Sequence, residues 1–204
     1  MEQDLCYFKK YGDQVEQRIS KLKTFADHNQ LAYPPRVKRS HTTAEVIRLY
    51  EEAEVSLPPD GDIKPEFDVA VAGRLVAIRV MGKSTFAHIE DGTGRLQIYL
   101  RKNDLGQDYD LFKKDYDLGD FIAVQGKPFR TRTGEITVHT DAFQLASKAL
   151  HPPPEKWHGI TDTEIRYRRR YLDLIANPEV RGIFRKRSRI ITAMRRFLDN
   201  QGFL

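Results

Sequence analysis

The sequence predicts a mainly β domain that is flanked in the chain by α-helices. Short segments of alternating apolar and polar residues follow one another between about residues 67 and 145. Apolar residues at helical spacing come before and after them, and proline-rich stretches separate the three zones. We therefore expect an N-terminal helical extension and linker at 1–60, a β domain at 61–147, and a connector with further helices at 148–204.

Two helices are expected before the β domain. The first spans about 13–28, and its apolar side consists of Val15, Ile19, Leu22 and either Phe25 or Ala26. Its polar side carries three cations, Arg18, Lys21 and Lys23. Thr42 and Glu45 have the spacing of a capping box, which predicts a second helix that runs to about Glu54. The linker VSLPPDGDIKPE then leads into the β domain.

The first strand is expected in FDVAVAGRLVAIRVM, residues 67–81. Val69 and Val71 share one side of this strand, whereas Val76, Ile78 and Val80 follow a different register. Glycine in the interior of a strand often marks a bulge, so the pattern predicts a long strand that is bent at Gly73. Arg79 is then expected to face outward.

A hairpin is expected in GKSTFAHIEDGTGRLQIYL, residues 82–100. If a four-residue turn spans 91–94, Ile89 pairs with Leu96 and Ala87 with Ile98, which gives one apolar inner side. The outer side then carries Phe86, His88, Gln97 and Tyr99. A ring beside an amide suits the stacking and recognition of a splayed base. The alternative is that Phe86 packs under a neighbouring loop.

The remaining β elements define the fold. A short helix is expected at about 109–116, then a strand in DFIAVQGKPFRT and a last strand in EITVHT. In the last strand Ile136 and Val138 are expected to face inward, and the outward residues are Glu135, Thr137 and His139. Three strands, a helix and two strands is the order of the OB-fold barrel, whose strand 2 and 3 face binds oligonucleotides. An SH3-like barrel also has five strands, but the helix between strands three and four favours the OB-fold.

The C-terminal zone begins with the connector SKALHPPPEKWHG. Thr161 and Glu164 have capping-box spacing, which predicts a helix to about Ile175. Asn177 and Pro178 are typical of the start of a longer helix, and Gly202 of its end. The apolar stripe of that helix consists of Val180, Ile183, Phe184, Ile190, Ile191, Met194, Phe197 and Leu198. Because apolar residues continue to the last position, we interpret the chain as a fragment.

Composition and charge narrow the functional classes. Residues 166–196 contain eleven basic residues and two acidic ones, so the net positive charge of this segment exceeds the +5 of the whole chain. This block suits a polyanion, or else it pairs with carboxylates of other protein segments or solvates a helix. No apolar run approaches a membrane span and no signal peptide is evident, so we expect a cytoplasmic protein. With Cys6 as the single cysteine, an internal disulfide and a multi-cysteine metal site are excluded.

No catalytic or metal-binding motif emerges from the sequence. The segment GKST at 82–85 is not a P-loop, because the position that requires the upstream glycine holds Ala77. Spaced carboxylates for a catalytic magnesium ion are not evident either. We therefore expect no catalytic residue, no metal ligand and no cofactor in this chain.

Four segments resemble the N-terminal part of bacterial-type lysyl-tRNA synthetases, which are class II enzymes. They are MGKSTFAHIEDGTGRLQIYL, FKKDYDLGDFIAVQGKPFRTRTGEITV, LHPPPEKWHGITDTEIRYRRRYLDLI and NPEVRGIFRKRSRIITAMRRFLDNQGFL. The resemblance covers nearly the whole chain. The barrel alone would also suit the aspartyl and asparaginyl relatives, but KWHGITDTEIRYRRRYLDLI resembles the lysyl enzymes specifically.

The resemblance implies roles for four residues in binding tRNA. The family's anticodon-binding positions match Arg79, Phe86, Gln97 and Glu135. By this resemblance Phe86 stacks on a uridine of the lysine anticodon, Gln97 recognises its edge, Glu135 accepts a hydrogen bond from another base, and Arg79 contributes charge or a hydrogen bond. Weaker RNA-binding candidates on the same surface are His88, Arg95 and Tyr99.

The resemblance also implies a parent enzyme that is a homodimer and attaches lysine to tRNA with ATP and Mg²⁺. Residues 178–201 resemble the start of class II motif 1, whereas motifs 2 and 3 are absent from this chain. We therefore expect the chain alone to be inactive. Two other hypotheses remain open, a stand-alone oligonucleotide-binding protein that uses the same barrel face and a helical oligomerisation module with the barrel as a scaffold.

Overall fold

The computed structural model describes residues 12–28, 30–57, 65–154, 160 and 162–203. Cys6 and Thr161 lie outside these ranges. The chain forms two compact units, Met1–Pro152 and Pro153–Leu204. Within the described ranges, no helix has both the length and the apolar character that a membrane crossing requires.

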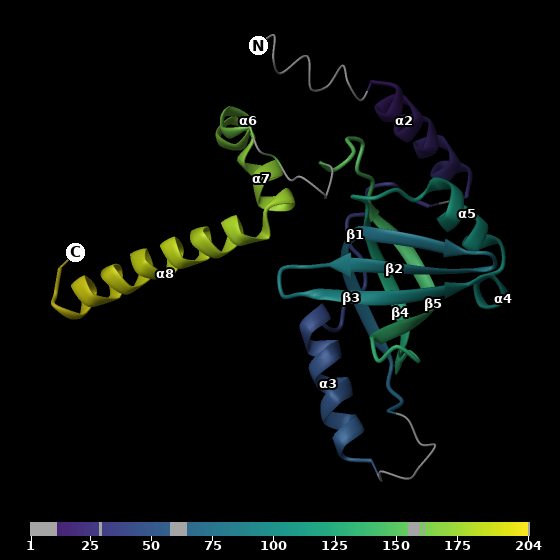
Figure 1. Ribbon diagram of the computed structural model, residues 1–204, viewed down its shortest axis with the longest axis horizontal. Helices are drawn as coiled ribbons and strands as arrows, with labels where there is room; N and C mark the ends of the chain where they lie inside the picture. The colour runs from purple at the N-terminus through teal and green to yellow at the C-terminus, as the bar shows by residue number, and fades with distance from the viewer. Residues whose placement is uncertain (1–11, 29, 58–64, 155–159, 161, 204) are drawn as a thin grey trace. The chain divides into compact units, whose positions relative to one another are not determined.

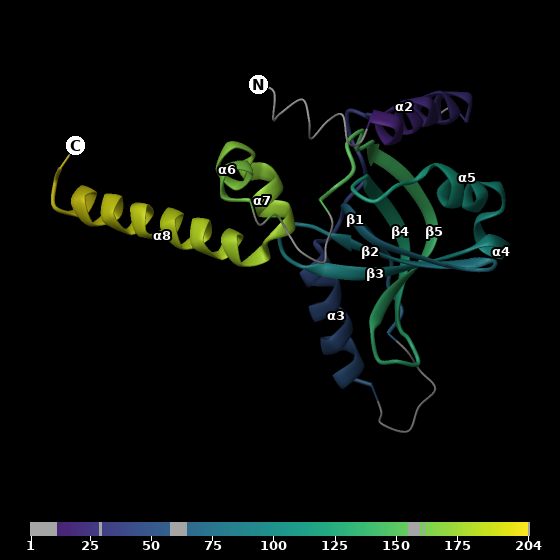
Figure 2. The same cartoon turned by 45° about the horizontal axis from the view of Figure 1, so that its top comes forward.

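Five strands of the first unit close into a barrel (Figures 1 and 2). The strands are β1 Val69–Met81, β2 Ser84–Glu90, β3 Arg95–Arg101, β4 Phe121–Arg130 and β5 Ile136–Ser147. They pair in the order β1-β2-β3-β5-β4, and β4 returns to β1 to complete the ring. The pairing of β3 with β5 is parallel, and the other four pairings are antiparallel. The predicted OB-fold order is confirmed.

Two short helices lie between β3 and β4, α4 Lys102–Leu105 and α5 Gln107–Asp115 (Figure 1). The expected helix near 109–116 is therefore confirmed. Its buried side contributes Tyr109, Leu111 and Phe112 to the core. The strands contribute the alternating inner residues, among them Val71, Leu75, Ala87, Ile89, Leu96, Ile98, Ile122, Val124, Val138 and Leu145. One continuous apolar core thus fills the barrel and extends under α5.

The hairpin of β2 and β3 has the predicted register. Ile89 pairs with Leu96, Ala87 with Ile98, and Phe86 with Tyr99. The backbone N–H of Asp91 donates to the carbonyl of Gly94 at 3.0 Å and closes the turn. Alternate side chains therefore point into the core and out of the barrel as the sequence pattern indicates.

The bulge in β1 lies later than predicted. Leu75 pairs with Ile89 and Ala77 with His88, so Val76 is the extra residue and the register changes there rather than at Gly73. Gly73 has a different function. A Cβ at this position would lie 3.0 Å from the backbone oxygen of Glu90, so the absence of a side chain allows two strands to approach closely.

Helix α3, Thr43–Val55, begins at the predicted capping box. The Asp91 carboxylate of the β2–β3 turn accepts from the backbone N–H of Thr43 at 2.9 Å and from its hydroxyl at 2.7 Å. It also accepts from the backbone N–H groups of Thr93 and Gly94. Burial alone would raise the pKa of Asp91, but these hydrogen bonds lower it to about 2. The start of α3 is therefore fixed to the hairpin.

The second unit consists of α6 Thr163–Arg168, α7 Arg170–Ala176 and α8 Pro178–Asn200. The single helix predicted to run to Ile175 is wrong, because Arg169 has non-helical backbone angles and separates α6 from α7. Asp162 caps α6 by accepting from the N–H of Ile165 at 3.0 Å. Asn177 does not cap α8 with its side chain, which donates to Asp173 instead. Gly202, with φ of 81°, ends α8 as predicted.

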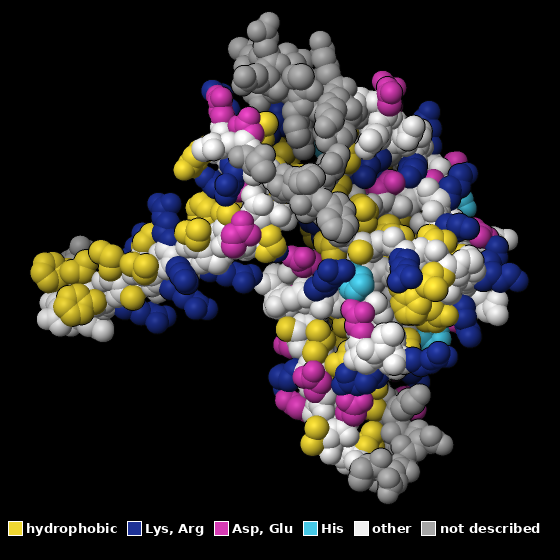
Figure 3. Space-filling model, viewed as in Figure 1, with side chains coloured by type: hydrophobic (Ala, Val, Ile, Leu, Met, Phe, Trp, Pro, Cys, Tyr) yellow, Lys and Arg dark blue, Asp and Glu magenta, His cyan; other side chains and the backbone are white. Residues whose placement is uncertain are grey.

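The apolar stripe of α8 lies mostly exposed. Figure 3 shows apolar side chains gathered along this helix. Val180 is buried, but Ile183, Ile190, Met194 and Phe197 are each at least 60% exposed. The guanidinium of Arg170 in α7 lies over the ring of Phe184, so the described part of the second unit covers only the beginning of the stripe. The prediction of an amphipathic helix that needs a partner therefore stands.

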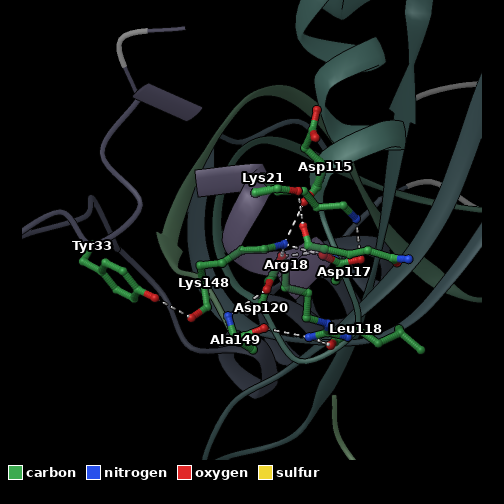
Figure 4. Close-up of polar contacts among 11 residues, drawn as sticks. Arg18, Lys21, Tyr33, Asp115, Asp117, Leu118, Asp120, Lys148 and Ala149 are labelled. Carbon is green, nitrogen blue, oxygen red and sulfur yellow. Dashed lines mark hydrogen bonds and ion pairs between the residues drawn. The ribbon is translucent and has the colours of Figure 1, made fainter. Parts of the chain in front are cut away.

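Helix α2 spans Gly12–Asp27, and its buried side differs from the predicted apolar side. Of the two alternatives for its last apolar position, Phe25 is buried and Ala26 is exposed, whereas Ile19 is 46% exposed. Arg18 was predicted on the polar side but is buried, and its guanidinium donates to the carbonyls of Leu118 at 3.1 Å and Ala149 at 2.7 Å (Figure 4). Two carbonyls of the first unit satisfy this cation, so α2 is attached through a polar contact.

Lys148 lies at the centre of the same region. Its side chain is fully buried, and its ammonium donates to the carbonyl of Asp115 and to the carboxylates of Asp117 and Asp120 (Figure 4). Asp117 also accepts from Lys21 of α2 at 2.7 Å. Burial alone would raise the pKa of Asp117, but the hydrogen bonds from the two lysines hold it below its ordinary value. We call these contacts, together with those of Arg18, the Lys148 network.

Candidate nucleic-acid interface

Two aromatic rings lie side by side on the outer face of β2 and β3. Phe86 and Tyr99 are directly opposite each other, with ring centroids 4.8 Å apart and an interplanar angle of 38°. Both side chains are partly exposed and point away from the core. Arg79 of β1 is the partner of Phe86 on its other side and is exposed. A flat apolar surface with a cation beside it is therefore accessible on this face of the barrel.

A polar cluster adjoins these rings. Glu135 lies directly before β5, and its carboxylate accepts from Gln97 Nε2 at 2.7 Å and contacts His88 Nε2 at 2.8 Å. At the other end of the Gln97 amide, the hydroxyl of Thr137 donates to Oε1 at 2.7 Å. We call these four residues the Gln97 cluster. It brings together side chains from β2, β3 and β5.

The position of Glu135 is fixed through its backbone. Thr131 Oγ1 accepts from the N–H of Glu135 at 3.0 Å and donates to its carbonyl at 3.1 Å. The backbone N–H of Thr131 donates to the same carbonyl at 3.0 Å. Three hydrogen bonds therefore hold the residue while 48% of its side chain remains exposed.

The aromatic surface continues beyond the hairpin. His139 of β5 lies 5.6 Å from Tyr99 between ring centroids, and Phe129 of β4 lies 6.2 Å from Tyr99. The imidazole of His139 contacts Asp104 at 2.8 Å. Sequence reasoning placed His139 on the outer side but did not identify Phe129, whose outward position follows from the alternation of β4 with Ile122 and Val124 inside.

Cations on and near this barrel face are of two kinds. Four of the exposed basic residues here make no side-chain hydrogen bond or ion pair with any residue that the structure describes, Arg79, Lys83, Arg95 and Arg132. Nearby Arg101 and Lys102, in contrast, pair with Asp104 and Asp110. Figure 3 shows Lys, Arg and His side chains beside apolar ones on the barrel face that carries β2 and β3. The unpaired cations are available to an anionic ligand.

The structure groups most of the sequence-predicted residues. Phe86 adjoins Arg79 and Tyr99, and Gln97 bonds Glu135, which in turn contacts His88. Arg95 lies apart from them in register, at the turn end of the hairpin opposite Glu90. The RNA-binding roles themselves stay predictions.

Sequence reasoning missed the contribution of Thr137. Alternation placed this residue on the outer side, yet it is fully buried, and its hydroxyl donates to Gln97. Among the residues that the structure describes, no group of three or more His, Cys, Asp or Glu side chains is arranged to hold a metal ion.

Comparison with known proteins gives two family matches. A family described as "OB-fold nucleic acid binding domain" matches residues 69–146, which include the whole barrel except its last residue. A second family, described as "tRNA synthetases class II (D, K and N)", matches residues 162–204. The matches fall on the two units separately.

Individual relatives are similar over most of this chain. A lysine–tRNA ligase of Pelotomaculum thermopropionicum is 48% identical over 188 residues, which is 92% of this chain and 35% of that protein. One from Aquifex aeolicus is 50% identical over 83% of this chain and 29% of its own length. One from Bacillus subtilis is 42% identical over 100% of this chain and 40% of its own length. The chain thus spans about a third of the length of these relatives.

Proposed function

We propose that the chain is the N-terminal part of a lysine–tRNA ligase and that its barrel binds the anticodon of a lysine tRNA. One observation carries this proposal. On the outer face of β2 and β3 an accessible ring, Phe86, lies beside the hydrogen-bonding pair Gln97 and Glu135, at the strand pair that OB-folds use for oligonucleotides. Arg79 and Arg95 on this side of the barrel have no ion-pair partner among the residues that the structure describes.

The proposed roles follow from the chemistry of the side chains. The Phe86 ring stacks on a uridine, because aromatic rings accept any base face and exclude water from it. Gln97 recognises the edge of that base, since an amide can both donate and accept. Glu135 is acceptor-only when ionised, so it takes a hydrogen bond from an N–H group of another base. Arg79 adds charge or a hydrogen bond next to Phe86.

We further propose that the whole protein is a homodimeric cytoplasmic enzyme that uses ATP and Mg²⁺ to attach lysine to tRNA. The relatives are lysine–tRNA ligases, which supports this reaction. In this proposal α8 is the beginning of motif 1, and the residues that bind ATP and Mg²⁺ belong to motifs 2 and 3, which this sequence lacks. The 204-residue chain then binds RNA without catalysing the reaction.

Substitution of Phe86 tests the anticodon assignment. Loss of base stacking costs roughly 1 to 3 kcal/mol, so Phe86→Ala should weaken binding of a lysine-type anticodon stem-loop by about tenfold to a hundredfold. Fluorescence anisotropy with labelled stem-loop RNA measures the change. Phe121→Ala is a matched control, because Phe121 is also a partly exposed barrel phenylalanine, on β4 against Arg74. It should leave RNA binding unchanged.

Two results would contradict the assignment. If Phe86→Ala binds the stem-loop like the parent chain, the ring does not contact RNA. If it lowers the melting temperature as strongly as a core truncation, the ring is structural.

Two other outcomes would favour the alternative functions. Equal affinity of the parent chain for an unrelated RNA hairpin would favour a stand-alone oligonucleotide-binding protein. Dimerisation without RNA binding would favour a helical oligomerisation module.

The absence of motifs 2 and 3 predicts a catalytically silent chain. Purified protein should show no lysine-dependent exchange of pyrophosphate into ATP and no charging of tRNA. The full-length relative from Bacillus subtilis serves as the positive control in the same assay. Lysine-dependent exchange by the clean chain would show that the reaction does not require the missing motifs.

A further inference from the structure

We propose that Thr137 is a positioning residue that determines which end of the Gln97 amide faces the RNA. The inference rests on the proposed function, because it concerns how the same face distinguishes uridine from cytidine. It assigns a role in base specificity to a buried residue that itself has no access to a base.

The first observation is the burial of Thr137. Its position on β5 is on the outer side of the barrel, where it pairs with Gln97 of the neighbouring strand. The side chain is nevertheless fully buried. Its hydroxyl donates to Gln97 Oε1 at 2.7 Å, whereas the carbonyl of Glu135 lies farther away, at 3.3 Å. The amide oxygen is therefore the closer acceptor for this hydrogen.

The second observation fixes the opposite end of the amide. The carboxylate of Glu135 can only accept, so the amide group that it contacts at 2.7 Å must be the Nε2 donor. A rotated amide would place its oxygen against the carboxylate and leave the Thr137 hydroxyl without this acceptor. Both neighbours therefore select the same orientation, in which one Nε2–H of Gln97 is still available to a ligand.

The two contacts differ in what happens when RNA binds. The Glu135 side chain is half exposed, and in the proposed function its carboxylate accepts a hydrogen bond from a different RNA base. His88 Nε2 is 3.5 Å from Gln97 Nε2 and is too distant to hold the amide firmly. The Thr137 hydroxyl is inaccessible to RNA and keeps its bond to Oε1. It is then the contact that continues to present the Gln97 N–H as a donor to a carbonyl of uracil.

Isosteric substitution tests this role. Thr137→Val removes the hydroxyl and keeps the branched shape, so the barrel should fold and Gln97 should lose its fixed orientation. We expect the affinity ratio between a uridine-containing anticodon stem-loop and its single cytidine variant to fall by about threefold to tenfold, the range of one neutral hydrogen bond. Thr137→Ser retains the hydroxyl and should keep the parent ratio. Anisotropy titrations with the two RNAs provide the measurement.

A double-substitution cycle separates positioning from a structural effect. If Thr137 acts through Gln97, Thr137→Val should change the uridine-to-cytidine ratio by less than about twofold in a Gln97→Ala background. An equal loss in both backgrounds, or a parent-like ratio in Thr137→Val alone, would overturn the inference. Failure of the proposed function is distinguishable, because Phe86→Ala and Gln97→Ala would then also leave RNA binding and preference unchanged.

Discussion

The Lys148 network and the Gln97 cluster are both polar clusters on the first unit, but they differ in how fully their groups are used. The Lys148 ammonium has three N–H donors and three oxygen partners, and the carboxylate of Asp120 accepts from Lys148, Asp117 and Ala149. Both side chains are fully buried. In the Gln97 cluster, Glu135 is half exposed and has acceptor capacity to spare.

This difference indicates which of the two clusters holds the fold and which binds a ligand. A buried group whose hydrogen-bonding capacity is filled cannot take a new partner without losing an old one. A partly exposed group with a spare donor or acceptor, next to a ring and to unpaired cations, can bind without disturbing the barrel. The comparison predicts separable effects on stability and on RNA recognition.

The largest expected effect is on stability. Lys148→Ala leaves the fully buried carboxylate of Asp120 without its ammonium partner, and the loss of such a partner costs about 3 to 5 kcal/mol of unfolding free energy. Lys102→Ala is the control, since Lys102 pairs with Asp110 at the surface and should cost less than about 1 kcal/mol. Urea denaturation followed by circular dichroism gives both values. Equal effects of the two substitutions would refute the distinction between a filled and an open cluster.

An intermediate effect is expected at Asp91, whose carboxylate is also filled by donors. Its pKa in the folded protein is about 2, below the ordinary value near 4, so its contribution is present above pH 4 and is lost as pH falls toward 2. About 2 kcal/mol should disappear over this window. Asp91→Asn should lack this part of the acid dependence in unfolding experiments between pH 5 and pH 2. An unchanged acid profile would show that the bonds to Thr43 and Thr93 do not depend on ionisation.

The smallest expected effect concerns the cations. Arg79 lacks an ion-pair partner among the described residues, so Arg79→Gln should weaken RNA binding and lower the slope of log affinity against log salt by about 1. Arg48→Gln provides the contrast, because Arg48 already pairs with Glu52 on α3. Titrations at several salt concentrations should show no slope change for this variant. A slope change at Arg48 and none at Arg79 would reverse the comparison.

Local pattern predicted much of the barrel. The pairing of Ile89 with Leu96 and the outward position of Phe86 follow from side-chain alternation and turn length, which are properties of neighbouring residues. The capping box at Thr42 is equally local, and the structure confirms it. The outer faces that carry the proposed site were therefore visible in the sequence.

Long-range contacts account for what the sequence did not predict. Helical spacing placed Arg18 on a polar side, but the carbonyls of Leu118 and Ala149 that bury it lie more than 95 residues away. Thr137 follows strand alternation correctly, yet it is buried and its hydroxyl donates to a glutamine 40 positions earlier. The bulge at Val76 depends on how β1 is shared between two partner strands. Periodicity contains no information on such contacts.

The parallel pairing of β3 with β5 is the shortest strand pairing of the barrel, and we call it the seam. Only three residue pairs join these strands, from Gln97 with Thr137 to Tyr99 with His139, and parallel pairing is the less stable kind per residue. The proposed ligand face spans this seam, because Phe86 and Gln97 lie on one side of it and Glu135 on the other. An RNA bound to the proposed face would contact residues on both sides of the β3–β5 pairing. Its binding free energy would therefore stabilise the closed barrel against separation of these two strands.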